Sequence, residues 1–356
     1  MADRLNRNAK PTLTTRSLHP ENKEAPFPFI GNDSVPTSLF YKRNHFDYPS
    51  LTYLNYWLPI GGFVTTPKVF SMQDLKNLPS KTLKVVLECA GNKRSYFRPK
   101  VFGEQWEKGA INQGFWTGVP LKTLLHSVGI QKEVTEVIIE GYDKGKKTGS
   151  NTLHSFKRSL PLEKALDPDT LIAYEYNEQP IPFEHGFPLR LIVPNWYAMA
   201  SVKWIKQITL HIGTFKGPFQ TEDYVYYPHV DNDQDSFPVT IHNVNSSIQQ
   251  PLDKQILTKG SHTITGIAWT GLGSISKVEI SIDHGTTWSQ TAIQRSVTDR
   301  YAWTSWTYEW VVEEKGEYTI MAKATDTNGR TQPLTPFWNR KGYGYNAIDQ
   351  VKVKVE

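Results

Sequence analysis

Cysteine is nearly absent from this chain, since Cys89 is the single cysteine among 356 residues. One cysteine excludes a disulfide within the chain, a zinc site made only of cysteines and an iron–sulfur cluster held by cysteines of this chain. It also excludes a CxxCH haem-attachment motif. Any catalytic or metal-binding role of cysteine must therefore use one thiol alone.

Long apolar runs and a dominant charge are missing as well. No segment reaches the ~18 consecutive apolar residues of a membrane helix, so we expect no membrane span. Residues 1–23 show neither an apolar core nor a twin arginine. We therefore expect a cytoplasmic location, with the periplasm as the alternative if a signal has been removed. The chain has 40 Lys and Arg against 35 Asp and Glu, and the net charge of +5 suits a small anion without requiring nucleic acid.

The apolar content is ample for folded cores, at 38% hydrophobic and 12% aromatic residues. Residues 1–35 are rich in Asn, Pro, Lys and Glu, and we interpret them as an extended N-terminal arm without a core of its own. Residues 36–235 mix short strands and helices without regular alternation, which favours an α+β domain. The predicted elements are strands at 84–88, 134–140, 189–193 and 204–212 and helices at 121–128 and 160–166.

The C-terminal part has a different pattern. Apolar and polar residues alternate at 264–269, 278–282, 306–312, 318–324 and 351–355. Turn sequences such as Asp283-His284-Gly285 and Asn328-Gly329 separate several of these segments. Short strands without helices predict an all-β, immunoglobulin-like sandwich over residues 250–356. The polar stretch from about 230 to 255 is the predicted boundary between the two domains.

Cys89 follows a predicted strand and begins the sequence Cys-Ala-Gly-Asn-Lys-Arg, in which Lys93 and Arg94 are basic. A lone cysteine is more often a buried structural residue, but this one lies where a strand gives way to a loop. Nearby cations stabilise the thiolate, the form that acts as a nucleophile or a metal ligand. From the residues alone, two chemistries remain open: a cysteine nucleophile paired with one of the 10 histidines, or a thiolate ligand to a soft metal.

The cysteine loop is one of seven ordered segments that resemble the sulfite oxidase family of molybdopterin enzymes. The other six are Arg43-Asn44-His45, Gly103-Glu-Gln-Trp106, Glu140-Gly-Tyr-Asp143, Ala173-Tyr-Glu175 through His185-Gly-Phe-Pro-Leu-Arg190, Val202-Lys203-Trp204 and Glu222-Asp-Tyr224. The tail, with Trp338-Asn339 and Gly342, resembles the dimerisation domain of molybdenum oxidoreductases. The resemblance covers residues 36–356 and implies a molybdopterin-binding domain followed by the sandwich.

The resemblance implies that Cys89 binds molybdenum, while a pyranopterin dithiolene in its mononucleotide-free form supplies two further sulfurs. It places His185, Arg190 and Lys203 near the cofactor phosphate, where charge-assisted donors are suitable. The other cofactor-binding residues that it implies are His45 and Asp143 on the pterin side, and Ser201.

The resemblance also implies an anion pocket made of Arg43, Arg94, Trp106 and Tyr224. Fixed cations attract and orient sulfite, and the Tyr224 hydroxyl can donate a hydrogen bond to it. Many sulfite oxidases complete this pocket with an arginine from the tail. Here Lys341 takes that position, with Arg340 beside it, and lysine keeps the charge but loses the bidentate geometry.

The implied activity is oxidation of sulfite to sulfate by oxygen-atom transfer, in a homodimer. Animal members carry a haem domain before the molybdenum domain, whereas only about 35 polar residues precede it here. We therefore expect no haem in this chain, and transfer of electrons to oxygen or to an external acceptor such as cytochrome c. The alternatives within the family are a nitrate reductase or another enzyme that processes an oxyanion or sulfoxide.

Two hypotheses from other functional classes explain less of the sequence. A non-catalytic β-sandwich binding module would leave the segments around Cys89 and His185 unexplained. A cysteine hydrolase would need a supporting motif around its histidine, and none is distinctive here.

Overall fold

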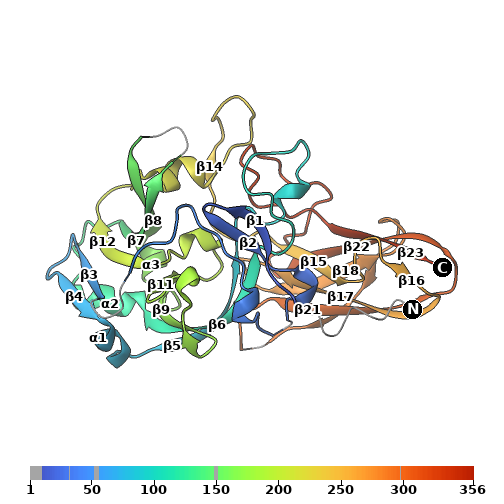
Figure 1. Ribbon diagram of the computed structural model, residues 1–356, viewed down its shortest axis with the longest axis horizontal. Coiled ribbons are helices and arrows are strands. Elements are labelled where there is room, and N and C mark those ends of the chain that lie inside the picture. The colour runs from blue at the N-terminus through green and yellow to red at the C-terminus, as the bar shows by residue number, and fades with distance from the viewer. Residues whose placement is uncertain (1–9, 32, 52–55, 148–150, 297) are drawn as a thin grey trace.

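The computed structural model describes residues 10–31, 33–51, 56–147, 151–296 and 298–356. Within them, a mixed N-terminal part lies beside a β-sandwich that contains the C-terminus (Figure 1). The predicted α+β domain followed by an all-β sandwich is confirmed. Residues 1–9 and 32 of the predicted arm lie outside the described residues, as do 52–55, 148–150 and 297 of the two predicted domains.

Two five-stranded sheets form the first part. One has the order β10-β9-β6-β5 with β11 paired to β9, and the other has the order β4-β3-β12-β7-β8. The strands of the first sheet are β5 (Lys81–Glu88), β6 (Ile111–Pro120), β9 (Leu171–Tyr176), β10 (Gln179–Pro180) and β11 (Arg190–Ile192). Those of the second are β3 (Trp57–Gly62), β4 (Lys68–Ser71), β7 (Glu136–Lys146), β8 (Leu153–Pro161) and β12 (Ile205–His211).

Helices are short in this part. Helix α2 spans Leu121–Val128, as predicted, because its leucines and Val128 recur at helical spacing and are buried, and Gly129 ends it with φ 71°. Helix α1 (Met72–Asn77) begins at a capping box formed by Ser71 and Asp74. The helix predicted at 160–166 is shorter than expected, since α3 covers Leu162–Ala165 and β8 continues to Pro161.

Single-turn helices carry several residues of the first part. They are η1 (Phe27–Phe29), η2 (Thr37–Leu39), η4 (Arg94–Tyr96), η5 (Phe183–His185), η6 (Ala198–Ala200) and the π-helical η7 (Phe219–Asp223). After η7, β13 (Val225–Tyr226) and β14 (Phe237–Pro238) form a small hairpin.

The C-terminal part packs two sheets face to face. Their orders are β15-β17-β21-β20 and β16-β23-β22-β18-β19. The strands are β15 (Asn245–Gln250), β16 (Ile256–Leu257), β17 (Gly260–Trp269), β18 (Ile275–Ser281), β19 (Ser289–Gln290), β20 (Ala292–Gln294), β21 (Thr304–Val312), β22 (Gly316–Asp326) and β23 (Asp349–Val355). The valines of β23 are buried and its lysines exposed, because successive side chains of a strand point to opposite faces.

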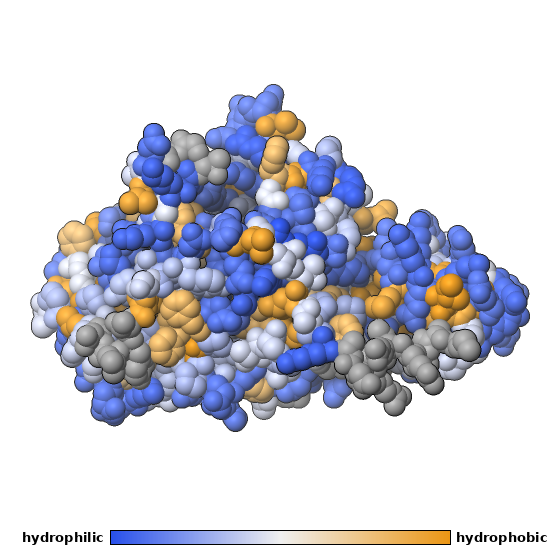
Figure 2. All heavy atoms as spheres, viewed as in Figure 1, coloured by the Kyte–Doolittle hydropathy of each residue, from blue (hydrophilic) through white to orange (hydrophobic). Residues whose placement is uncertain are grey.

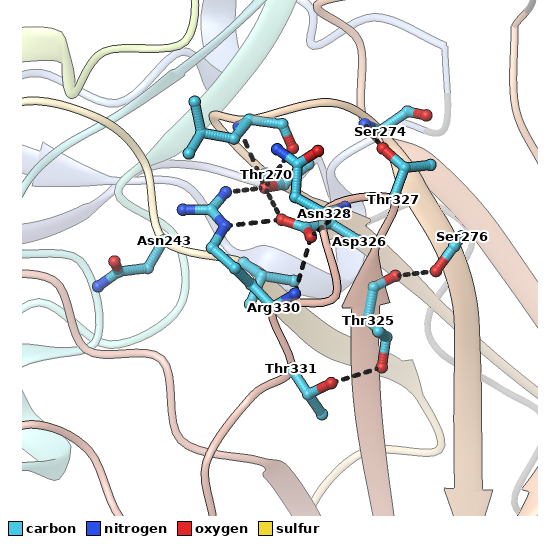
Figure 3. Close-up of polar contacts among 12 residues, drawn as sticks. Asn243, Thr270, Ser274, Ser276, Thr325, Asp326, Thr327, Asn328, Arg330 and Thr331 are labelled. Carbon is cyan, nitrogen blue, oxygen red and sulfur yellow. Dashed lines mark hydrogen bonds and ion pairs between the residues drawn. The ribbon is translucent and has the colours of Figure 1, made fainter.

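Asp326, at the end of β22, organises the turn that follows. Its buried carboxylate accepts hydrogen bonds from Arg330 Nε at 2.8 Å and from the Thr270 hydroxyl at 2.9 Å (Figure 3). Backbone N–H groups of Asn328 and Arg330 donate to the same carboxylate. The Asn328-Gly329 turn predicted from the sequence is thereby tied to the opposite sheet of the sandwich.

The N-terminal segment differs from the extended arm predicted for residues 1–35. Its described residues form a hairpin of β1 (Thr14–Leu18) and β2 (Glu21–Glu24). Further along, Phe27 and Ile30 are buried in a cluster with Trp269 and Trp303 of the sandwich. The average polarity of the segment concealed these few apolar side chains, which gain their core from the rest of the chain. The sandwich also begins earlier than residue 250, since β15 is one of its strands.

The face seen in Figure 2 is largely hydrophilic, with scattered apolar patches. Among the described residues, no helix is long and apolar enough to cross a membrane.

Candidate active site and cofactor cavity

Cys89 is held at the start of a rigid loop after β5. Its backbone N–H donates to Ala110 O at 2.9 Å, and its own carbonyl accepts from Asn92 N at 2.8 Å. Lys93 has φ 62°, which lets the chain turn into η4. The loop is also tied to the sandwich, because buried Glu88 accepts from Trp269 Nε1 at 2.9 Å. The fold thus holds the thiol at a fixed place in the first domain, on a loop that is hydrogen-bonded to the sandwich.

One cavity contains the Cys89 thiol and lies where the two sheets of the first domain converge. Nine of the residues predicted from the sequence line it: Arg43, His45, Cys89, Asp143, His185, Arg190, Ser201, Lys203 and Tyr224. They come from segments more than 100 positions apart, including β7, β11, η5 and the residues after η6 and η7. The structure therefore brings together the whole predicted cofactor set and two of the predicted substrate residues.

The charge of this cavity favours an anion. Arg43, Arg190 and Lys203 contribute cations to its wall, and Asp143 is the acidic residue there. Burial lowers the pKa of Arg190 to about 10, and burial together with the nearby Arg190 cation lowers that of Lys203 well below its usual value. Burial causes the first shift, and burial with neighbouring cations causes the second, so a bound anion would favour the charged form of both side chains.

Two buried polar atoms of the cavity-lining residues have no hydrogen-bond partner among the described residues. Arg190 Nη1 donates to His185 O at 3.1 Å, whereas its Nε is buried without an acceptor among the described residues. Asp143 Oδ1 is likewise buried without a donor, and burial raises the pKa of Asp143 to about 6. Buried polar groups are almost always hydrogen-bonded, so these atoms indicate a bound group. An unused guanidinium donor, a carboxylate and one thiol fit the phosphate, pterin and metal of molybdopterin.

The same cavity contains a tyrosine–histidine pair. The Tyr224 hydroxyl lies 2.7 Å from His45 Nε2. Desolvation and the neighbouring Arg43 lower the pKa of His45 well below its usual range, so the imidazole is neutral. With its proton on Nδ1, His45 accepts from Tyr224; with its proton on Nε2, it donates and leaves the Tyr224 O–H free for an anion.

Arg94 and Trp106 lie behind the cavity wall and do not line the cavity itself. Arg94 is buried, and its Nε donates to Lys341 O at 3.0 Å while its Nη1 donates to Glu104 O at 3.1 Å. Its charge acts on the site all the same, because Arg43 and Arg94 oppose the burial that raises the pKa of the Cys89 thiol. Trp106 packs in the apolar cluster that contains Cys89, and its indole N–H is buried without an acceptor among the described residues.

Lys341 and Arg340 are not in the cavity, contrary to the prediction. Lys341 Nζ lies 3.7 Å from Asp223 Oδ1, and the side chain is 38% exposed. Arg340 pairs with Asp233 and stacks on the ring of Tyr227 at 4.2 Å. Lys341 lies beside a carboxylate at the end of η7, and Arg340 pairs with a carboxylate of the exposed loop between β13 and β14. A comparison of sequence positions could not foresee these partners.

Sequence reasoning missed the apolar wall and two buried neighbours of Tyr224. The remaining lining residues are Phe40, Tyr41, Ala90, Phe156, Ala198 and Met199. Phe40 stacks on His185 with ring centroids 4.0 Å apart, which fixes the imidazole. Arg158 and Tyr343 each contact the Tyr224 ring. No sequence pattern distinguishes Arg158 from the other polar residues of β8. Tyr343, in contrast, directly follows Gly342, which is part of the resemblance to the dimerisation domain.

Comparison with known proteins agrees with this geometry. The family described as "Oxidoreductase molybdopterin binding domain" matches residues 45–219, and "Mo-co oxidoreductase dimerisation domain" matches residues 237–356. The domain limits predicted from the sequence, 36–235 and 250–356, are similar to these matched ranges but not identical.

Curated relatives match over nearly the whole chain. Mitochondrial sulfite oxidase of Mus musculus is 33% identical over 97% of this chain, which spans 66% of that protein's length. Sulfite oxidase of Arabidopsis thaliana is 30% identical over 93% of this chain and 91% of its own. An NADH nitrate reductase of Solanum lycopersicum is also 30% identical, with 40% of its length covered.

Among solved structures, the sulfane dehydrogenase SoxCD of Paracoccus pantotrophus superposes with a TM-score of 0.82 at 25% identity. The match covers 98% of this chain and 92% of that one. With the cavity, the two domain matches and these relatives in agreement, the chain belongs to the sulfite oxidase family of molybdopterin-binding oxidoreductases.

Proposed function

We propose that this chain oxidises sulfite to sulfate with a molybdenum–molybdopterin cofactor bound through Cys89. The observation that carries the proposal is the convergence of Cys89, Arg43, Arg190 and Lys203 in one cavity with an excess of positive charge. A lone thiol suits a metal whose other ligands come from its cofactor, and clustered cations suit two anions, the cofactor phosphate and the substrate. The names of the curated relatives support the choice of sulfite.

The residues of this chain divide the work of binding the cofactor. Arg190 and Lys203 hold the phosphate of the mononucleotide-free form, since a guanidinium and an ammonium are strong charge-assisted donors. Asp143 accepts from the N–H groups of the pterin, and Cys89 supplies the thiolate. The bound cofactor supplies a redox centre that exchanges one oxygen atom and two electrons with the substrate.

The residues at the substrate end attract and orient the anion. Arg43 lies in the cavity wall, and Arg94 adds positive charge from behind it. His45, which the resemblance places on the pterin side, lies within hydrogen-bond distance of Tyr224, and the pair can direct one O–H toward the anion when His45 carries its proton on Nε2. Overall, sulfite and water give sulfate, two protons and two electrons. We propose that the electrons pass to oxygen or to a separate carrier such as cytochrome c.

Metal analysis and turnover test the proposal together. The holoenzyme, expressed in a host that makes the cofactor, should contain about one molybdenum per chain because Cys89 provides one binding position. It should oxidise sulfite with ferricyanide, cytochrome c or oxygen. Comparing the three acceptors identifies the electron carrier. Absence of molybdenum, or a loaded enzyme that turns over no sulfite with any acceptor, would contradict the proposal.

Nitrate reduction is the alternative that the nitrate reductase match supports. The predicted preference for sulfite rested partly on Lys341, and that side chain pairs with Asp223 outside the cavity. Nitrate turnover with reduced viologen, measured beside sulfite turnover on the same preparation, distinguishes the two reactions.

We also propose that the chain forms a homodimer, because it carries the Mo-co oxidoreductase dimerisation domain. Light scattering after size-exclusion chromatography tests this, and a mass of one chain at micromolar concentration would refute it. A cytoplasmic location stays a prediction that cell fractionation can test.

A further inference from the structure

Arg158 is a buried arginine that forms no ion pair with any described residue. Its side chain comes from β8 and is 1% exposed. Its Nη1 donates to Phe219 O, while its Nε is buried without an acceptor among the described residues. Asp223 is the carboxylate whose charge reaches it, yet Asp223 forms its ion pairs with Lys147 at 3.1 Å and Lys341 at 3.7 Å.

A buried cation without a counter-charge is strongly unfavourable. Burial accordingly lowers the pKa of Arg158 to about 10, which still leaves the guanidinium charged at neutral pH. A protein retains such a group most readily where a bound anion supplies the missing charge. The nearest candidate is the anion that would occupy the cavity beside Tyr224.

Arg158 belongs to a continuous stack of cations and rings. Its Cζ lies 5.4 Å from the centroid of the Tyr224 ring, and the Tyr224 and Tyr343 rings are stacked at 5.3 Å with an interplanar angle of 27°. Arg94 Cζ in turn lies 5.0 Å from the Tyr343 centroid. The stack joins β8, the end of η7, the tail and η4.

The stack connects two expected substrate residues through two that were not expected. Tyr224 and Arg94 are the residues predicted to act on the anion. The Arg158 guanidinium packs on the ring of Tyr224, and the Tyr343 ring packs on the guanidinium of Arg94. Tyr343 comes from the segment between β22 and β23, so the sandwich domain contributes a ring that stacks on Tyr224 of the cavity wall. Both domains must therefore dock for Tyr224 to be fully supported.

We propose that Arg158 and Tyr343 are positioning residues for the substrate anion, which fix the Tyr224 ring and, in the case of Arg158, add positive charge that draws the anion in. This inference rests on the proposed function for the identity of the substrate. It goes beyond that function by assigning roles to two residues outside the cavity lining.

Sulfate binding to the oxidised holoenzyme tests the proposal without turnover. Calorimetry should show the sulfate Kd raised about 10-fold or more in Arg158→Gln, with a smaller rise in Arg158→Lys, because a desolvated cation–ring contact and its charge are lost. Tyr343→Leu should raise it about 3- to 10-fold, and Tyr343→Phe, which keeps the ring, should stay near the parent. The sulfite KM should rise in parallel, more than kcat falls.

Thermal unfolding separates positioning from a structural role. Because removing an uncompensated buried charge does not destabilise the fold, Arg158→Gln should keep or raise the midpoint of the parent. Matched controls are Arg300→Gln, which removes an exposed arginine stacked on Tyr301 at 4.7 Å, and Tyr345→Leu from the same tail segment. Both controls should leave the sulfate Kd unchanged.

The outcomes are distinct. A sulfate Kd of Arg158→Gln within about twofold of the parent, or a parental holoenzyme that binds no sulfate, overturns the inference. A parental enzyme that binds sulfate but oxidises no sulfite contradicts the proposed function alone. If the midpoint falls sharply and the Kd stays constant, Arg158 is structural and the inference fails.

Discussion

Asp143→Asn tests the cofactor assignment most directly, because it should move cofactor binding and apoprotein stability in opposite directions. Asp143 is 5% exposed and its Oδ1 has no donor among the described residues. Burial raises its pKa from 3.8 to about 6, with Lys203 opposing the shift. The described residues therefore leave one oxygen of this buried carboxylate free to accept a hydrogen bond from the cofactor.

The magnitude for the apoprotein follows from the pKa shift. A raised carboxyl pKa means that the ionised form is less stable in the folded state, so its unfavourable contribution appears as pH rises from 3.8 and is complete above 6. Two pKa units correspond to about 3 kcal/mol. Asn avoids this contribution, so apo Asp143→Asn should unfold a few degrees above the parent at pH 7.5, with no difference near pH 4.

The magnitude for the cofactor follows from its hydrogen bonds. A bond to a carboxylate contributes about 1.5–3 kcal/mol and a neutral bond about 0.5–1.5 kcal/mol. The exchange therefore weakens cofactor retention about 5- to 15-fold for each bond. Molybdenum per chain, measured after desalting and dilution of protein from a cofactor-competent host, should fall accordingly.

Asp169→Asn is the matched control. Asp169 is also buried, but it accepts from Lys81 Nζ at 2.9 Å and from the Tyr301 hydroxyl at 2.7 Å, so its partners are already present. Its replacement should lower the unfolding midpoint and leave the molybdenum content unchanged. If Asp143→Asn behaves in the same way as this control, Asp143 is a structural carboxylate and the reasoning is refuted.

Three further predictions concern the thiol, the tail and acid stability. Cys89→Ser should lower sulfite turnover at least about 100-fold with an unchanged unfolding midpoint, because a direct metal ligand is lost; parental turnover would refute the ligand assignment. Lys341→Arg should leave the sulfite KM within about twofold, since the side chain pairs with Asp223 at the surface; a tenfold drop would show that it enters the cavity. Burial lowers the pKa of His242 to about 3. As pH falls below 6.5, His242 is therefore protonated in the unfolded chain but stays neutral in the folded one, which lowers the free energy of unfolding. His242→Gln should remove about 1.4 kcal/mol of destabilisation per pH unit below that point, measured by urea unfolding at pH 7.5 and 5.5; equal acid sensitivity of parent and variant would contradict it.

Local patterns predicted much of the fold. Helix α2 and the strands of the sandwich were visible because their side chains repeat at 3.6 or 2 residues and bury one face. The N-terminal hairpin was not visible, because Phe27 and Ile30 find their core only against Trp269 and Trp303. Such contacts between distant segments leave no periodic signal in either one.

The cofactor end of the site was predictable for a similar reason. Its residues lie in short segments, such as those around Cys89 and His185, whose residue types match the chemistry of a thiolate ligand and phosphate donors. The substrate end was predicted less well. Arg94 lies outside the cavity lining, where it donates to Lys341 O. The Lys341 side chain lies beside Asp223 and not in the cavity. Arg158, which contacts the Tyr224 ring, belongs to no recognisable sequence motif.

The sequence by itself determined the chemical groups of this protein: one thiol, a set of cations and the order of segments that carry them. The tertiary structure decided which of these groups share a cavity, because that depends on how two sheets and a sandwich pack. It also decided which cations are paired, since Lys341 lies beside the carboxylate of Asp223, whereas buried Arg158 forms no ion pair with a described residue. Burial and pairing are properties of packed neighbours, and neighbours across domains are set by the fold rather than by any local stretch of chain.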